Sequence, residues 1–171
     1  MKKLNKKGFT IVELVIVIAV IAILAGVLIP TFATVVDKAN KSSAEQQARN
    51  FYTLLEAATA APTTYTKDSK TYTLSLQPTG LIIKGTDTTT NSMTILQGIL
   101  GEDAKIYNGA KVASDGETTT GDTRTITKIY FQPKDSKYYV EIDLVAGTVG
   151  EAKKVEGDTT MPTGSVELNF N

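Results

Sequence analysis

Glu13 is the residue of this sequence whose position most clearly needs a chemical explanation. It is the only ionisable side chain among the 22 residues from Phe9 to Pro30, which are otherwise almost entirely apolar. A carboxylate within a bilayer costs free energy, so such a residue usually has a partner and a function, although the first turn of a segment costs less than its centre. Glu13 is therefore the first candidate for a functional residue.

Other chemistry is limited by composition, because the chain has neither cysteine nor histidine. This excludes thiol nucleophiles, histidine bases, disulfides and ordinary zinc sites. The stretch Asp115-Gly116-Glu117, with Gly121-Asp122, offers oxygen ligands for Ca²⁺, but its spacing does not match an EF-hand and favours a solvated loop. The other carboxylates are scattered and indicate no acid–base pair. The sequence therefore predicts no enzyme, no metal and no cofactor.

The apolar run has the length of a membrane-spanning helix. As a helix, Phe9 to Ile29 would span about 31 Å, close to the hydrocarbon thickness of a bilayer. The lysines Lys2, Lys3, Lys6 and Lys7 all precede the run, which predicts a cytoplasmic leader and an exported C-terminal part. An ordinary secretory signal would have a shorter apolar segment and a small-residue cleavage site. A plain membrane anchor fits the length but leaves Glu13 unexplained.

The charge of the chain argues against a general nucleic-acid-binding surface. There are 18 basic and 18 acidic residues, and removal of residues 1–8 takes away four lysines. The remainder then has 14 basic against 18 acidic residues, a net charge of −4. A mildly acidic protein does not attract the phosphate backbone, so no specific nucleic-acid partner is predicted.

The stretch Gly8-Phe9-Thr10-Ile11-Val12-Glu13-Leu14 resembles the signature of type IV prepilins, the family of pilins and pseudopilins. The resemblance covers about the first third of the chain and includes the long apolar helix and Pro30. It implies cleavage between Gly8 and Phe9 by a prepilin peptidase, which also N-methylates Phe9. It further implies assembly through Phe9 and Glu13, with Glu13 pairing with the Phe9 amine of a neighbouring subunit. Helix geometry also allows the pairing within one subunit, because residues four apart lie on the same face.

The resemblance implies a structural subunit of a type IV pilus or a related filament. Its partners would be the membrane, the prepilin peptidase and methyltransferase, an inner-membrane platform protein, an assembly ATPase and further copies of itself. The subunit would be a single-pass membrane protein before assembly and part of a surface filament afterwards. Two alternatives stay open: a minor pilin or adhesin at a filament tip, and a pseudopilin of a type II secretion or competence system.

The helix is predicted to continue beyond the membrane. Residues 31–62 carry apolar side chains at helical spacing, namely Ala44, Ala48, Phe51, Tyr52, Leu55 and Ala58. Pro62 ends this amphipathic segment. Between the two halves, Pro30 lacks an N–H group and clashes with the carbonyl of Gly26, which predicts a kink or a melted stretch.

Residues 63–171 are predicted to form an exported domain with an antiparallel sheet. Strands are expected around Tyr72–Leu76 and Leu81–Ile83, and a short helix, capped by Asn91 or Ser92, up to Leu100. Thr123–Phe131 and Lys137–Val145 should form a hairpin around a turn at 132–136, and Ser165–Phe170 another strand. Packing a small sheet on the exported half of the helix would give an α+β fold, and the resemblance implies the same pilin fold. Because no disulfide is possible, another contact must hold the C-terminal region.

Overall fold

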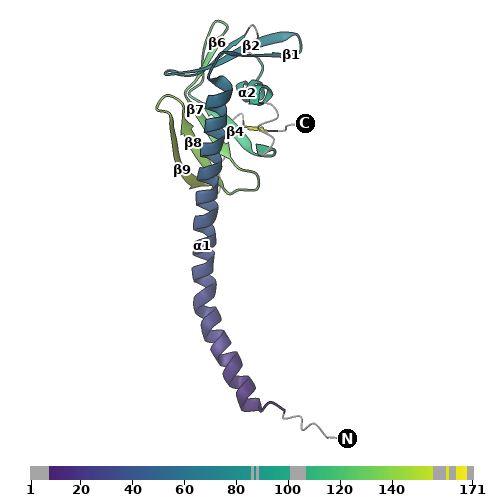
Figure 1. Cartoon of the computed structure of the whole chain (residues 1–171), viewed down its shortest axis with the longest axis vertical. Coiled ribbons are helices and arrows are strands. Elements are labelled where there is room, and N and C mark those ends of the chain that lie inside the picture. Colours follow the sequence, from purple (N-terminus) through teal and green to yellow (C-terminus); the bar gives the residue numbers. More distant parts are fainter. Residues whose placement is uncertain are drawn as a thin grey trace. The chain divides into compact units, whose positions relative to one another are not determined.

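The computed structural model describes residues 8–85, 87, 89–100, 107–155, 161 and 165–168. The chain divides into two compact units, Met1–Ala39 and Asn40–Asn171. A single long helix, α1 (Ile11–Thr59), contributes its first part to one unit and its last part to the other (Figure 1). The predicted leader, residues 1–8, lies outside the described residues except for Gly8.

Helix α1 confirms the long helix that the sequence predicts. In the second unit its buried side chains are Ala44, Ala48, Phe51 and Leu55, and Thr59 is buried at its end. Four of these five positions belong to the predicted apolar face. In the first unit the helix is assigned without a break through Gly26 and Pro30, so the structure shows no melted stretch. The kink remains a prediction.

Two five-stranded antiparallel sheets complete the second unit, where the sequence predicted one small sheet. Sheet A has the order β1-β2-β3-β6-β5 and sheet B the order β10-β4-β7-β8-β9. The strands of sheet A are β1 (Thr63–Lys67), β2 (Lys70–Gln77), β3 (Gly80–Gly85), β5 (Thr118–Thr120) and β6 (Thr123–Ile126). Those of sheet B are β4 (Lys111–Asp115), β7 (Lys128–Gln132), β8 (Tyr138–Asp143), β9 (Thr148–Lys154) and β10 (Val166–Glu167).

The predicted strand Thr123–Phe131 is divided between the two sheets. Its first half is β6, which pairs with β3, and its second half is β7, which pairs with β4 and β8. The division falls at Thr127, whose carbonyl accepts a hydrogen bond from the Leu144 N–H at 2.9 Å. The expectation of one continuous strand was therefore wrong. The hairpin of β7 and β8 is confirmed, and in β8 buried and half-buried residues alternate from Tyr138.

Helix α2 (Ser92–Leu100) confirms the predicted short helix and its cap. The Asn91 side-chain oxygen accepts a hydrogen bond from the Met93 N–H at 2.8 Å, as expected of an N-cap. A Cβ atom at Gly98 would lie 2.1 Å from the Tyr65 ring of β1. Glycine is therefore required inside this helix by the close packing of the tyrosine ring. The expected stop at Gly101 lies outside the described residues.

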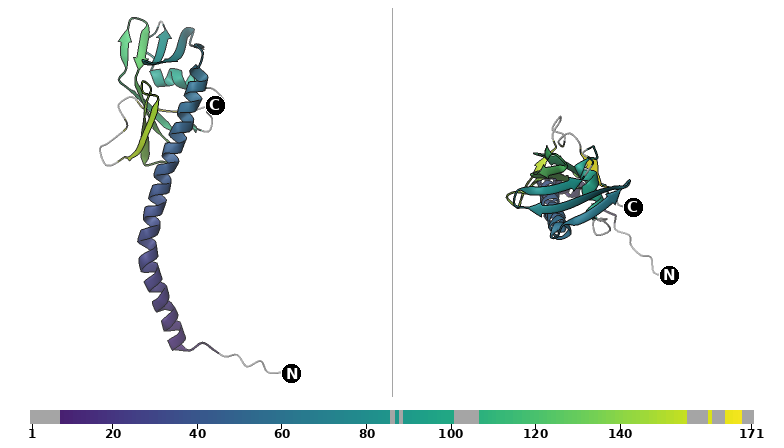
Figure 2. Two further views of the ribbon diagram at one scale, coloured as in Figure 1. Left: turned by 60° about the vertical axis from the view of Figure 1, so that its left-hand side comes forward. Right: turned by 90° about the horizontal axis from the view of Figure 1, so that it is seen from above.

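A cluster of aromatic rings joins α1 to sheet B. The Phe51 ring stacks on the Phe131 ring of β7 with centroids 4.8 Å apart, and Tyr107 packs edge-on against both. At the edge of the sheet, the Glu45 carboxylate accepts a hydrogen bond from the Ala152 N–H of β9 at 3.0 Å. The last part of α1 thus packs across sheet B, as the views in Figures 1 and 2 show, and contacts the edge strand β9 through Glu45.

The C-terminal region is held by strand pairing and burial. Strand β10 pairs with β4, and the backbone of Leu168 makes two hydrogen bonds of 2.8 Å, to Gly109 and to Ala110. The Leu168 side chain is fully buried. These contacts take the place of the absent disulfide. Phe170, the last residue of the predicted alternation, lies outside the described residues.

Candidate functional site

The N-terminal end of α1 carries the predicted site residues, and here Glu13 contacts Thr10. One carboxylate oxygen of Glu13, Oε2, accepts hydrogen bonds from both the backbone N–H and the hydroxyl of Thr10, each at 2.8 Å. In return, the Thr10 hydroxyl accepts the Glu13 N–H at 3.2 Å. This reciprocal arrangement is a capping box, in which a threonine N-cap and a glutamate three residues later satisfy free N–H groups of the first turn.

Thr10 is the residue of this site to which the sequence analysis assigned no role. The signal was present, because Thr10 and Glu13 have the Thr-x-x-Glu spacing that precedes an apolar run in capping boxes. Both hydrogen bonds to the carboxylate end on Oε2. Among the described residues, Oε1 has no hydrogen-bond partner, so this oxygen is available to a second donor.

Gly8 and Phe9 precede the capping box and are both exposed. The Phe9 side chain is 90% exposed, and a Cβ atom at Gly8 would have no neighbour within 4 Å. The peptide bond between them is therefore open to another protein. In the unprocessed chain the Phe9 nitrogen is part of the peptide bond to Gly8, so the pairing of Glu13 with a Phe9 amine stays a prediction.

The helix beyond Glu13 presents apolar side chains to its surroundings on every side. Large apolar residues from Ile11 to Val36 are at least 41% exposed, and α1 is long and apolar enough to cross a membrane. A contiguous exposed apolar surface of this size requires lipid or protein to cover it. Gly26 and Pro30 both lie on this exposed part of α1. A Cβ atom at Gly26 would meet nothing within 4 Å, so the helix surface at Gly26 is open to its surroundings.

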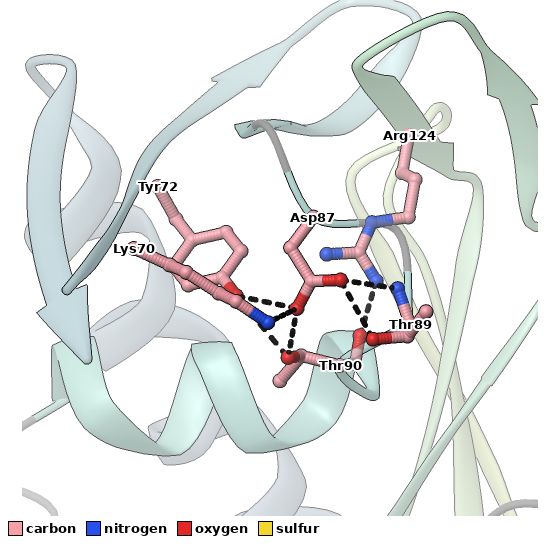
Figure 3. A network of polar contacts seen from close by, with 6 residues as sticks. All are labelled: Lys70, Tyr72, Asp87, Thr89, Thr90 and Arg124. Atoms are coloured by element: carbon pink, nitrogen blue, oxygen red, sulfur yellow. Dashed lines mark hydrogen bonds and ion pairs between the residues drawn. The ribbon is translucent and has the colours of Figure 1, made fainter. Parts of the chain in front are cut away.

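A polar network in the second unit centres on Asp87 (Figure 3). Its Oδ2 atom accepts hydrogen bonds from the Lys70 ammonium group at 2.8 Å, the Tyr72 hydroxyl at 3.1 Å and the Thr90 hydroxyl at 2.7 Å. Its Oδ1 atom accepts two more from Thr89. The bond from Lys70, followed by those from Thr89 and Thr90, holds the pKa of the Asp87 carboxyl well below its usual range. The network ties the segment before α2 to β2.

Arg124 of β6 completes this network from the buried side. Its Nη1 atom donates to the Thr90 carbonyl and, at 3.1 Å, to the Ser92 hydroxyl. Arg124 is 3% exposed, and its Nη2 atom has no hydrogen-bond partner among the residues that the structure describes. Arg124, Asp87 and Lys70 are far apart in the sequence, and the sequence analysis did not find them. Their contacts fix the residues that lead into α2, which is a structural role.

The candidate calcium loop forms its own hydrogen bonds. Asp115 accepts from the Gly116 N–H at 2.7 Å, and Glu117 accepts from the hydroxyls of Ser92 and Ser114. Among the residues that the structure describes, no group of three or more acidic side chains is placed to hold a metal ion. Apart from the N-terminal segment, the described residues therefore offer structural networks and no evident reactive constellation.

The comparisons with known proteins concern the same N-terminal segment. Residues 3–29 match the model of the prokaryotic N-terminal methylation motif. The chain is similar to the type IV wide pilus major component PilA4 of Thermus thermophilus, with 61% identity over 36 residues. That stretch is 21% of this chain and 28% of the Thermus protein, so the match spans less than a third of either. No solved structure matches the chain. Residues 3–29 thus carry the prokaryotic N-terminal methylation motif, and the chain is similar over a short stretch to a component of a type IV pilus.

Proposed function

We propose that this protein is a structural subunit of a type IV pilus or a related filament. The observation that carries the proposal is the exposed apolar surface of α1 from Ile11 to Val36, which no described residue of a single copy covers. In the precursor, lipid covers this surface. In the filament, the same segments of neighbouring copies replace the lipid, and contacts that repeat head to tail without closing into a ring build a helix of subunits.

Processing comes before assembly in this proposal. A prepilin peptidase hydrolyses the peptide bond between Gly8 and Phe9, which converts the amide nitrogen of Phe9 into an amine. The same enzyme then N-methylates this amine. An α-amino group is mostly cationic at neutral pH. The capping box keeps the Glu13 side chain in one orientation, with Oε1 free to accept from such an amine on a neighbouring copy. This pairing compensates both charges in an apolar filament core and sets the axial register of each incoming subunit.

Further partners follow from the proposed assembly. The precursor requires the peptidase and methyltransferase, and its extraction from the membrane requires an inner-membrane platform protein and an assembly ATPase. Gly26 and Pro30 lie in the segment that must leave the lipid, where the missing N–H group of proline weakens the helix. We infer that this local weakness lets the segment adjust as it moves from lipid into the filament core.

The alternatives make different demands on the exported unit. An adhesin that recognises apolar ligands would present an exposed aromatic or apolar patch away from α1. Among the described residues of 40–171, Val145 is the only large apolar side chain that is strongly exposed. This favours a subunit that assembles through its helix over an apolar adhesin. A pseudopilin would share every feature of the N-terminal segment and differs in the system that it serves.

Two variants of Glu13 and Thr10 test the proposal with separate readouts. Glu13→Gln removes the charge but keeps a side chain that can complete the capping box, whereas Thr10→Val removes the hydroxyl and keeps the charge. Mass spectrometry of the wild-type chain should find N-methyl-Phe9 as its first residue. Shearing should release filaments that contain it. We expect Glu13→Gln to be cleaved normally but to yield few filaments, and Thr10→Val to show a milder loss.

The same measurements can refute the proposal. A mature N-terminus near residue 30 would mean an ordinary secretory signal. A wild-type chain that is absent from surface filaments, under conditions in which its membrane form is abundant, would exclude a filament subunit. Normal processing, methylation and filament yield in Glu13→Gln would remove the role given to the Glu13 charge.

A further inference from the structure

The two ends of sheet B carry opposite charge. At one end, strands β4 and β9 and the turn between β7 and β8 bring together four exposed lysines: Lys111, Lys134, Lys137 and Lys154. The strand register places them there, because Lys111 lies opposite Gln132 and Lys154 lies opposite Tyr138. None of the four forms an ion pair with a described residue. With Asp135 and Glu167 among them, this basic end has a net charge of +2.

The basic end is also hollowed. A groove of about 460 Å³ lies between the β7–β8 turn, the start of β4 and Glu167 of β10, and Lys111, Lys134 and Lys137 line it. A second groove, of about 200 Å³, lies between the same turn and residues Asn40 to Gln47 of α1. A turn that carries two lysines thus separates two concave surfaces, both of which lie within the second unit.

The opposite end of the sheet is acidic. Asp115 closes β4, Asp143 closes β8, and Glu117 follows in the loop after β4. Each carboxylate accepts hydrogen bonds from neighbouring N–H or hydroxyl groups, but none forms an ion pair with a described residue. The nearby Lys128 is already paired with Glu141 at 2.7 Å. The acidic end therefore has a net charge of −3. The four residue steps from Lys111 to Asp115 separate the two ends by about 13 Å along the strand.

We propose that the basic end of one copy contacts the acidic end of the next copy in the filament. This inference rests on the proposed function, since it needs a head-to-tail array of identical chains. Two different patches on one chain make a heterologous contact, which extends without closing. Complementary charge selects the partner and its register more than it adds affinity. The charge contact would thus fix the register between exported units, as Glu13 is proposed to fix it within the apolar core.

A second copy fits the charges better than the other candidate partners. Both halves of the contact are on the same chain, and a mature chain with a net charge of −4 would be repelled by anionic polymers and lipid surfaces. A partner that presents a compact acidic patch pairs with the four lysines without bringing the acidic end against like charge. The next copy in a head-to-tail array presents such a patch.

Charge exchange in the full chain tests the inference. Lys137→Glu with Lys154→Glu reverses the basic end at two exposed side chains. The matched control, Lys67→Glu with Lys84→Glu, makes the same change in net charge at two exposed strand lysines of sheet A. We expect the first pair to lower the yield of sheared filaments about tenfold at low salt, because like charges would then face each other across every contact. We expect the control pair to leave the yield unchanged.

Adding Asp115→Lys to the reversed basic end restores opposite charge across the contact. We expect this triple variant to recover most of the yield, while Asp115→Lys alone loses yield, and we expect all variants to be processed at Gly8 and to resist protease like the wild type. The proposal is overturned by normal filaments in Lys137→Glu/Lys154→Glu, by an equal loss in the control pair, or by no recovery in a protease-resistant triple variant. Loss of binding to anionic vesicles with unchanged filament yield would equally overturn it. In each of these cases, if the wild-type chain still forms filaments, only the charge contact is refuted and the proposed function as a filament subunit stands.

Discussion

Phe51 joins the exported part of α1 to sheet B, and its truncation is the sharpest test of the fold. The side chain is fully buried and contacts the rings of Phe131 and Tyr107 at centroid distances of 4.8 Å and 5.5 Å. Replacing a buried phenylalanine with alanine costs about 3–5 kcal/mol. The two aromatic pairs contribute about 0.5–1.5 kcal/mol each. Because these pairs are lost and the surrounding sheets restrict the collapse of the site, we expect Phe51→Ala to lie at the upper end of the range for alanine replacement, about 4–5 kcal/mol.

A loss of this size is readily measured. For a unit of the size of residues 40–171, each kcal/mol shifts the Tm by roughly 4 °C, so the Tm should fall by roughly 15–20 °C. The assay is thermal unfolding of the full chain in detergent, followed by the near-ultraviolet circular dichroism of tyrosine, since the chain has no tryptophan. Phe32→Ala is the matched control, because Phe32 lies on the same helix and is 66% exposed. A decrease in Tm of less than about 5 °C for Phe51→Ala, or an equal decrease for Phe32→Ala, would refute this packing of Phe51.

Four further outcomes are expected. Thr10→Ser should keep the capping box and assemble as the wild type does, whereas a filament defect in Thr10→Ser as large as that in Thr10→Val would show that the hydroxyl is not sufficient and would contradict the role given to the capping box. Leu168→Ala should lower the free energy of unfolding by about 2–5 kcal/mol and make the C-terminal region sensitive to carboxypeptidase; unchanged resistance would contradict the burial of Leu168. The Asp87 pKa is lowered chiefly by Lys70, so the folded state binds fewer protons than the unfolded state, and the stability from this network is present above about pH 4 and lost as pH falls below it. Asp87→Asn should therefore reduce the Tm at neutral pH and flatten its fall in acid, and parallel pH profiles for both proteins would exclude this role. Pro30→Ala should stiffen the helix and change the extensibility of filaments under flow, with Phe32→Ala as a neighbouring substitution that leaves the backbone unaltered.

Local signals in the sequence were sufficient for the helices and for the N-terminal segment. Apolar spacing predicted α1 and its buried face, because a side chain at every third or fourth position lies on one side of a helix wherever that helix occurs. Asn91 predicted the start of α2 for the same reason, since a cap involves only adjacent residues. The capping box of Thr10 and Glu13 is equally local. Its spacing was visible in the sequence, but the sequence analysis considered for Glu13 only the Phe9 amine of its own or a neighbouring subunit.

Tertiary structure decided what depends on residues far apart in the chain. β-Propensity runs without interruption from Thr123 to Phe131, and it contains no information about which strand will lie alongside. The break at Thr127 arises because β3 pairs with the first half and β4 and β8 pair with the second. The Asp87 network and the two charged ends of sheet B depend on the same pairing, since strand register brings together side chains that are dozens of residues apart. Propensity and periodicity describe one segment at a time, whereas register is a property of two paired strands.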